Sequence, residues 1–307
     1  MAGATNPESR RDVTHGVLWM VGCLASFIGM AVASRELAAS LSIFQILFFR
    51  ALVGLAILAF FARAIWPELK RCERLGLHTV RNSVHFVAQF CWTLGVALLP
   101  LAEVFALEFT MPIWVALFAY LFLGERLDTA RLLACVGSFL GVLVILRPGV
   151  ALLDPASFIV LAAAMGYGLS IVMVKSLTQT CSPGIVVAWM ILLQLPMGLA
   201  FALTDWRPSS LGDVPWILVA GLTGLSAHYT MAQALRRLDA SVAIPVDFLR
   251  VPLIALVGFY FYQESIEVWV FVGALMIFGS NYYAILRSSR AAQNPAPQVK
   301  GTPTRSR

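Results

Sequence analysis

Apolar runs of about twenty residues alternate with short polar segments along nearly the whole chain. A helix rises about 1.5 Å per residue, so about twenty apolar residues cross the ~30 Å hydrocarbon layer of a bilayer. The alternation therefore predicts ten membrane-spanning helices. They cover residues 15–34, 40–62, 79–99, 101–123, 129–147, 155–177, 182–204, 214–235, 240–262 and 266–287.

Part of this pattern occurs twice. Residues 109–127 align without a gap with residues 248–266, at an offset of 139. The alignment pairs Phe109 with Phe248, Glu125 with Glu264, and the acidic residues Glu108 and Asp247 just before it. A repeat of about half the chain length, inside membrane-spanning sequence, is typical of secondary transporters. Because five is an odd number of spans, the two halves should cross the membrane in opposite directions.

We therefore predict an all-α polytopic membrane protein, with ten transmembrane helices arranged as two inverted five-helix repeats. The repeats cover residues 15–150 and 151–288, after an N-terminal segment (1–14) and before a polar, Pro-rich tail (289–307) predicted to be disordered. An Arg pair before the first apolar run and an Ala-Val-Ala sequence near its end superficially resemble a cleavable signal peptide. We expect this segment to remain as a membrane helix, since cleavage would leave nine spans and orphan the first half of the repeat.

The composition supports a membrane protein and excludes a soluble one. The chain is 60% hydrophobic and 12% charged, about half the charged fraction of a soluble domain. Its formal net charge of +6 could indicate a nucleic-acid partner. However, seventeen of the 22 Lys and Arg residues lie in segments on one predicted side, and only Arg35, Arg147 and Arg207 lie on the other. This positive-inside bias predicts that both termini are cytoplasmic, in a bacterial inner membrane. It also explains the positive net charge without a nucleic-acid partner. The partners we expect are membrane lipid and a small-molecule substrate.

Four charged residues fall within about 6 Å of the centres of predicted spans, where a formal charge costs at least about 2.5–3.5 kcal/mol. Arg50 and Arg250 fall near the centres of spans two and nine. Glu108 falls about 6 Å to the outside of the centre of span four, and Asp247 about 6 Å to the inside of the centre of span nine. We interpret all four as substrate-binding candidates and the two acids as proton-coupling candidates, since low-dielectric surroundings disfavour a charged carboxylate. The alternative is ion pairs that only fix helix packing, such as Asp247 with Arg250 three residues later.

Prolines and aromatic residues extend the candidate site. Pro112 interrupts span four, and Pro245 and Pro252 interrupt span nine, which in transporters points to the binding site. Neighbouring spans contribute His85, Gln89, Trp92, Tyr167, His228 and Tyr229 as further substrate-binding candidates. Trp92 and Tyr229 align at an offset of 137, so each half should present one aromatic ring to the substrate. The alternative for each of these residues is core packing.

The sequence offers no catalytic or metal site and implies no cofactor. The five cysteines form no CxxC pair, and Walker A, HExxH and GxSxG motifs are absent. Ser226 and His228 lie close in sequence but on one predicted helix, so a membrane-embedded enzyme is the weaker alternative. Gly137 and Gly141 place two small residues four apart in span five, which allows a homodimer as an alternative to a monomer.

Four segments resemble a known family. They are LPLAEVFALEFTMPIW with LGERL downstream, IPVDFLRVPLIALVGFYFYQES, FFRALVG, and VILRPG. Over about residues 15–288 the chain resembles the EamA-type transporters of the drug/metabolite transporter superfamily, although it has QES at 263–265 where its first half has GER. The resemblance implies cytoplasmic termini and a cavity lined by spans one, three, four, six, eight and nine. It also implies a secondary transporter for an amino-acid-like or amino-acid-derived metabolite, or alternatively for S-adenosylmethionine, riboflavin or another aromatic metabolite.

Overall fold

The computed structural model describes residues 7–71, 74–125, 129–147, 154–238 and 240–293, and the regular structure in these ranges is entirely helical. The helices are α1 (Pro7–Ala38), α2 (Ile43–Phe60), α3 (Ala62–Lys70), α4 (Leu75–Leu98), α5 (Leu101–Glu108), α6 (Met111–Leu123), α7 (Thr129–Leu146), α8 (Pro155–Leu177), α9 (Pro183–Ala202), the short 3₁₀ helix η1 (Leu203–Asp205), α10 (Asp213–Leu235), α11 (Ala240–Phe248), α12 (Arg250–Tyr262) and α13 (Val268–Gln293).

Seven segments of the described chain are long and apolar enough to cross a membrane. They are Thr14–Ala38, Ile43–Phe60, Leu101–Leu123, Pro155–Leu177, Pro183–Asp205, Pro245–Tyr262 and Val268–Arg287. The three other predicted spans correspond to α4, α7 and α10; in α7 the apolar stretch is only Leu132–Leu146. Ten spans remain a prediction, but seven suffice for a multi-pass membrane protein.

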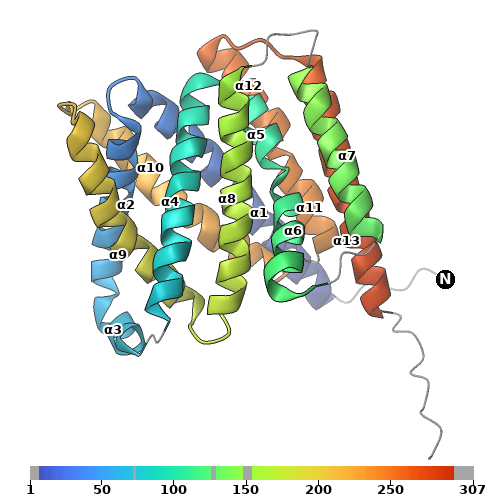
Figure 1. Cartoon of the computed structure of the whole chain (residues 1–307), viewed down its shortest axis with the longest axis horizontal. Helices are drawn as coiled ribbons and strands as arrows, with labels where there is room; N and C mark the ends of the chain where they lie inside the picture. The colour runs from blue at the N-terminus through green and yellow to red at the C-terminus, as the bar shows by residue number, and fades with distance from the viewer. Residues whose placement is uncertain (1–6, 72–73, 126–128, 148–153, 239, 294–307) are drawn as a thin grey trace, which may run out of the picture.

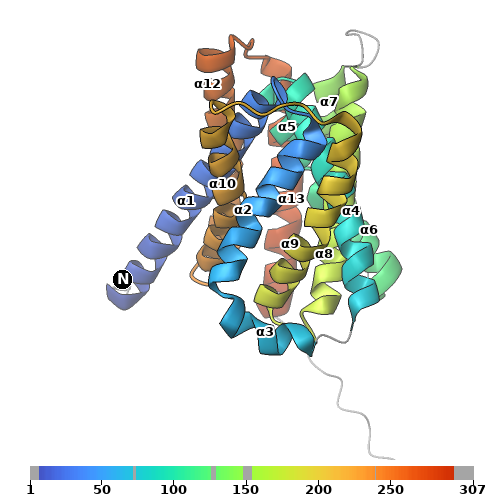
Figure 2. The same ribbon diagram turned by 90° about the vertical axis from the view of Figure 1, so that its left-hand side faces the viewer.

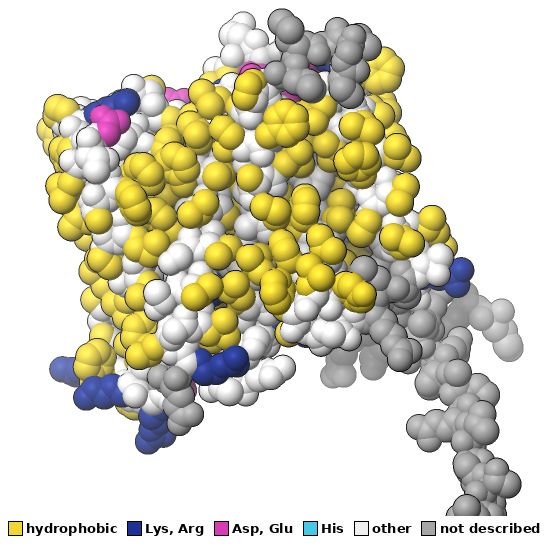
Figure 3. All heavy atoms as spheres, viewed as in Figure 1, with side chains coloured by type: hydrophobic (Ala, Val, Ile, Leu, Met, Phe, Trp, Pro, Cys, Tyr) yellow, Lys and Arg dark blue, Asp and Glu magenta, His cyan; other side chains and the backbone are white. Residues whose placement is uncertain are grey.

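The helices run side by side between two ends of a bundle (Figures 1 and 2). α1 begins and α13 ends at the same end, where α3 also lies. A broad belt of apolar side chains covers the face shown in Figure 3, and the charged side chains visible there gather near its two rims. This is the surface expected of a bundle that lies in a bilayer.

Helices from the two halves of the chain are interleaved. α1 packs against α10, α2 against α9, α4 against α8, and α7 against α13. Glycines allow two of these approaches: a Cβ on Gly198 of α9 would lie 3.1 Å from the Cα of Phe48 in α2, and one on Gly166 of α8 would lie 2.9 Å from the Cβ of Ala88 in α4. The core therefore forms only when both halves are present.

The small-residue stripe of the fifth predicted span is used inside the chain. A Cβ on Gly137 would lie 2.0 Å from Ser280 Oγ, and one on Gly141 would lie 2.7 Å from the carbonyl of Gly273. Both contacts are with α13, whose backbone approaches closely only because α7 lacks side chains at these positions. The idea that this stripe provides a homodimer face is therefore wrong.

The fourth and ninth predicted spans are each broken into two helices. α5 ends at Glu108 before α6, and α11 ends at Phe248 before α12. Each break lies just before a proline, Pro112 or Pro252, whose ring clashes with the carbonyl four residues earlier and which donates no N–H. The sequence predicted interruptions at Pro112, Pro245 and Pro252. The structure places the breaks about one turn upstream of Pro112 and Pro252, whereas Pro245 lies inside α11 and does not interrupt it.

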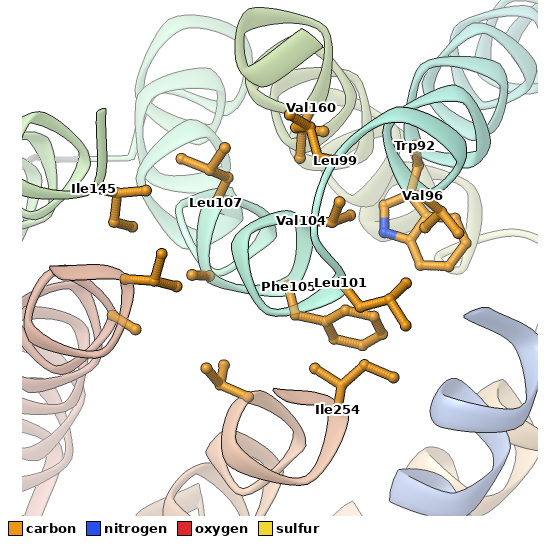
Figure 4. Packing of buried hydrophobic residues seen from close by; sticks show 14 of the residues in the cluster. Trp92, Val96, Leu99, Leu101, Val104, Phe105, Leu107, Ile145, Val160 and Ile254 are labelled. Carbon is orange, nitrogen blue, oxygen red and sulfur yellow. The ribbon is translucent and has the colours of Figure 1, made fainter. Parts of the chain in front are cut away.

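The first half-helix of the fourth span lies at the centre of the core. Leu101, Val104, Phe105 and Leu107 of α5 are fully buried. Figure 4 shows them surrounded by Trp92 and Val96 of α4, Val160 of α8, Ile145 of α7 and Ile254 of α12. This packing holds the end of α5, and thus Glu108, in a fixed position between the two halves.

The chain ends differ from the sequence-based boundaries. α1 begins at Pro7, inside the N-terminal segment predicted at 1–14, and α13 continues to Gln293, past the predicted start of the tail at residue 289. Residues 1–6, most of the tail (294–307) and the predicted repeat boundary at residues 150 and 151 lie outside the described ranges.

α6 and α12, which are equivalent in the repeat, end in the same way. α6 is followed by Gly124 and α12 by Gln263, in left-handed conformations with φ of 67° and 56°. After each, the backbone N–H of the following glutamate donates to the carbonyl six residues before it, at 3.3 and 3.1 Å. The change from GER to QES therefore places a Cβ where glycine is preferred.

Gln263→Gly is expected to stabilise the protein by about 0.5–1 kcal/mol. A left-handed conformation costs a residue with a Cβ about 1–2 kcal/mol, and the greater freedom of glycine in the unfolded chain offsets part of the gain. Thermal unfolding in detergent measures the effect. The reciprocal variant Gly124→Gln is the matched control and should lower stability, since a Cβ there meets nothing within 4 Å and only the backbone is strained. Shifts of the same sign in both variants would contradict this reasoning.

Candidate functional site

The break in the ninth predicted span brings two opposite charges together. Asp247 lies in the last turn of α11 and Arg250 is the first residue of α12. Arg250 Nη2 donates to Asp247 Oδ2 at 2.7 Å. The side chain of Arg250 is only 7% exposed and that of Asp247 15%, so the pair is inside the bundle.

The break in the fourth predicted span adds a second acid to the same arginine. Glu108 Oε1 lies 3.8 Å from Arg250 Nη1, and Trp92 Nε1 donates to Glu108 Oε2 at 2.7 Å. The two breaks also touch through Phe109 and Phe248, whose ring centroids are 5.4 Å apart. We refer to Glu108, Asp247 and Arg250 as the acidic cluster, because with all three ionised it has a net charge of −1.

Aromatic rings line the other side of the acidic cluster. The guanidinium carbon of Arg250 lies 4.2 Å from the ring centroid of Phe27 and 5.0 Å from that of Phe109. Such contacts stabilise a cation without neutralising the two carboxylates. Arg250 Nε and Asp247 Oδ1 are buried and have no hydrogen-bond partner in the described part of the chain. The cluster therefore retains capacity to bind a further polar group or proton.

Arg50 occupies a separate, smaller cavity. It lies in α2, and its Nη2 is 3.3 Å from the sulfur of Met30. The cavity has a volume of about 40 Å³, and its polar lining residues are Arg50, Gln89, Gln194 and His228. Gly224 closes one side, where a Cβ would lie 3.2 Å from Arg50 Nη2. No carboxylate of the described residues forms an ion pair with Arg50.

The structure thus divides most of the predicted site residues between two neighbouring groups. Phe27 lies between the groups: its ring is 4.2 Å from the Arg250 guanidinium and 6.3 Å from the ring of His228. Tyr167 packs against His85, with ring centroids 5.4 Å apart. The cavity around Arg50 is lined by α2, α4, α9 and α10. The second and seventh predicted spans (α2 and α9) therefore contribute to it, although the family resemblance did not include them among the spans that line the cavity.

Tyr229 does not join either group. It is 58% exposed on the outside of α10 and packs edge-on against Trp19, with ring centroids 5.7 Å apart. Adjacent residues on a helix point about 100° apart, so when His228 faces the cavity Tyr229 cannot. The expected pairing of Trp92 and Tyr229 as equivalent rings around a substrate does not fit this structure, in which Trp92 is buried against Glu108.

The structure also changes the depth in the membrane that the sequence predicted for Glu108 and Asp247. The sequence placed Glu108 and Asp247 on opposite sides of the membrane centre, with arginines between them. Both acids instead contact the single guanidinium of Arg250, at 3.8 and 2.7 Å. Counting 1.5 Å per residue along an unbroken helix misplaces them, because each acid lies at a break where two half-helices meet.

Sequence reasoning missed a polar stripe on α4. His78, Arg81 and Asn82 are at most 8% exposed. His78 packs against Trp189 of α9, with ring centroids 6.0 Å apart, and His85 Nδ1 lies 3.0 Å from Gln194 Nε2 of the same helix. Arg81 is one of the seventeen basic residues that the sequence assigns to the cytoplasmic side. The signal was present: 78, 81, 82 and 85 follow the i, i+3, i+4, i+7 spacing of one helix face.

A larger cavity, of about 400 Å³, lies along α6 from Met111 at its start to Glu125 just after its end. It is lined by residues of α6, α7, α8 and α13, mostly apolar, and includes Glu125, Lys175 and Asn281. Lys175 Nζ donates to Glu125 Oε1 at its edge. None of the predicted site residues lines this cavity. Among the described residues, no group of three or more His, Cys, Asp or Glu could hold a metal ion.

A model of the EamA-like transporter family matches the chain twice, over residues 14–147 and 155–286. The chain belongs to this family. Two EamA repeats therefore cover almost all of it, which confirms the family expected from the sequence motifs.

Several EamA relatives have named functions. A riboflavin transporter of Rhizobium johnstonii is 30% identical over 236 residues, which are 73% of this chain and 78% of the relative. An S-adenosylmethionine uptake transporter of Rickettsia bellii is 20% identical over 284 residues, 92% of this chain and 98% of the relative. A solved crystal structure matches with a TM-score of 0.56 at 19% identity, covering 93% of this chain and 99% of that one, and shows the shared fold alone. By its family, this EamA protein is therefore a membrane transporter of small metabolites.

Proposed function

We propose that the protein is a secondary transporter that moves a small organic metabolite, amino-acid-like or amino-acid-derived, across the bacterial inner membrane by alternating access. The observation that carries the proposal is the buried acidic cluster, where the broken helices of both EamA repeats meet at Arg250. Broken helices around buried charges at mid-membrane are the usual construction of a transporter's binding site.

We infer ten spans in two inverted repeats, and a contact between equivalent residues supports the two-fold relation between the halves. Phe109 and Phe248, which are paired by the sequence repeat, touch each other. Residues on a two-fold axis contact their own equivalents, whereas residues of two independent domains do not. The identical ends of α6 and α12 support the same relation.

A pair of salt bridges repeats across the halves. Glu264 follows α12 of the second repeat and binds Arg35 in the last turn of α1, with 2.9 Å between Oε1 and Nη1. Glu125 follows α6 of the first repeat and binds Lys175 in the last turn of α8. Each glutamate thus closes one end of the bundle onto the other repeat, as two gates of an alternating-access carrier would.

The two ends differ in this conformation. Glu264 also accepts the backbone N–H of Leu101 at 2.9 Å, and its side chain is only 12% exposed. Lys175 is 61% exposed, and the 400 Å³ cavity opens beside it. This asymmetry supports a state closed at the Glu264 end.

Riboflavin and S-adenosylmethionine are the alternative substrates within this function, because relatives bear those names. Uptake into proteoliposomes of labelled riboflavin, S-adenosylmethionine and a panel of amino acids tests the proposal. Saturable uptake of at least one compound, recovered chemically unchanged, is the expected result. Absence of uptake for the whole panel, or chemical conversion of a compound, would reject it.

The orientation is a separate prediction. We expect both termini in the cytoplasm, so a cysteine at Gly76 should react with impermeant maleimide only in inside-out vesicles, and one at Ser209 in whole cells. Both positions are exposed, Gly76 in the first turn of α4 and Ser209 in the loop before α10, and a Cβ on Gly76 meets nothing within 4 Å. A background with Cys23, Cys72, Cys91, Cys135 and Cys181 replaced is the control. The reverse pattern would invert the assigned orientation.

A further inference from the structure

The stripe on α4 contains more hydrogen-bond donors than the protein satisfies. Buried atoms without a partner in the described chain include both ring nitrogens of His78, Arg81 Nε, Asn82 Nδ2 and, on the facing α9, Trp189 Nε1. His78 and Asn82 are fully buried and Arg81 is 8% exposed. Leaving a buried donor unpaired is unfavourable, so such groups usually have an acceptor.

The hydrogen bonds that the stripe does make leave its positive charge uncompensated. Arg81 Nη1 donates to Asn82 Oδ1 at 2.7 Å, and Gln194 Nε2 is 3.0 Å from His85 Nδ1. Among the described ion pairs none involves Arg81 or Arg50. Arg250, by contrast, has two carboxylates. The interior therefore has one cluster with excess negative charge and a second region with two unpaired guanidinium groups.

The stripe is joined to the Arg50 cavity through Gln194 of α9. Gln194 lines the cavity with Arg50, and its Nε2 also contacts the carbonyl of Asn82 at 3.3 Å. The same Gln194 Nε2 lies 3.0 Å from His85 Nδ1. His78 is only one turn from the start of α4, so the polar residues of this helix extend from near one end of it to its middle.

We propose that Arg81 and Arg50, with His85 and Gln194 between them, bind the anionic group of the transported molecule, a carboxylate or a phosphate. This proposal rests on the proposed transport function. An anion with several acceptor oxygens would satisfy the unpaired donors and neutralise the guanidinium groups, and arginine binds either group through two parallel hydrogen bonds. The 40 Å³ cavity, which Arg50 and Gln194 line but Arg81 and His85 do not, is close to the volume of one water molecule, so only part of the anionic group fits there in this conformation.

This assignment moves the anion site away from Arg250. The acids Glu108 and Asp247 already balance the charge of the Arg250 guanidinium, at 3.8 and 2.7 Å. An anion there would approach a cluster of net charge −1. Arg81 and Arg50 instead present two positive charges that no carboxylate of the described residues pairs with.

Anion binding to the purified, detergent-solubilised protein tests the proposal directly. The probes are inorganic phosphate, benzoate, and benzamide as the uncharged analogue of benzoate, each titrated in chloride buffer at constant ionic strength. We expect phosphate or benzoate, and not benzamide, to raise Tm by on the order of 3 °C at ten times its apparent Kd. Whichever anion raises Tm shows whether the site binds a phosphate or a carboxylate. A response to neither anion, or an equal response to benzamide, overturns the proposal.

Variants locate the effect. Arg81→Gln and Arg50→Gln should each raise the apparent Kd of the active anion at least tenfold, while Arg63→Gln, on exposed α3, should leave it unchanged. Without an added anion both site variants should be at least as stable as the wild type, because each removes an uncompensated buried charge; a structural arginine would instead lower Tm. Wild-type anion response in either site variant would contradict the assignment. If the wild type takes up a substrate but shows no anion response, only the anion site fails.

Discussion

Arg250→Met is expected to destabilise the protein more than any other single change in the acidic cluster, by about 3–5 kcal/mol. It leaves the carboxylates of Asp247 and Glu108, with side chains 15% and 14% exposed, without a cation. The triple variant with Arg250→Met, Glu108→Gln and Asp247→Asn removes all three charges and should recover most of the loss. Denaturant unfolding in detergent measures both.

Arg236 provides the matched control for this prediction. It is exposed at the end of α10, so Arg236→Met should change stability by less than about 0.5 kcal/mol. If Arg250→Met is as stable as this control, the cluster does not exist as an ion-paired unit. If the triple variant is no more stable than the single one, the loss comes from packing against Phe27 and Phe109 rather than from unpaired charge.

Glu108→Gln and Asp247→Asn should each abolish accumulation of substrate against its gradient while leaving exchange of substrate for substrate intact. The acidic cluster has one negative charge in excess, so one proton neutralises it, and either variant fixes it at zero without leaving Arg250 unpaired. This charge balance is why we expect both variants to fold. The measurement is uptake into proteoliposomes under an imposed pH gradient, with the substrate found in the uptake screen.

Asp205→Asn is the control for the coupling test, since Asp205 lies exposed in η1 and pairs only with Arg207 in the described structure. It should accumulate substrate as the wild type does. Accumulation by both cluster variants would show that Glu108 and Asp247 are structural, with Arg250 as their fixed partner. Loss of exchange as well as accumulation would assign the acids to substrate binding instead of coupling.

The sequence predicted the helices well because hydropathy depends on the local chain. It located the charged residues and both broken spans, and its repeat alignment paired Phe109 with Phe248, which touch in the structure. It could not predict that Glu108 and Asp247 share one arginine, because helix periodicity shows which residues share a face and not which helix that face meets.

The same limit explains the residues that sequence reasoning misplaced. Tyr229 follows a cavity residue directly, and only the rotation of α10 decides that it lies on the outside. Arg81 lies one to two turns from the start of α4, where a basic residue resembles a cytoplasmic anchor until packing against α9 shows that it is buried. Gly137 and Gly141 predicted a close helix contact correctly, but the partner is α13 of the same chain.

The interleaving of the two halves has a consequence for how the protein is made. α1 and α2 are among the first helices to enter the bilayer, yet their packing partners α10 and α9 are synthesised more than a hundred residues later. At about 5–20 residues per second that delay is on the order of ten seconds. During this interval the nascent N-terminal half exposes Arg50 and Glu108 to lipid or to the insertion machinery, with Arg250 not yet translated. Assembly of this transporter is therefore a late, post-insertion event, and the unfinished chain is the stage at which quality-control proteases would meet it.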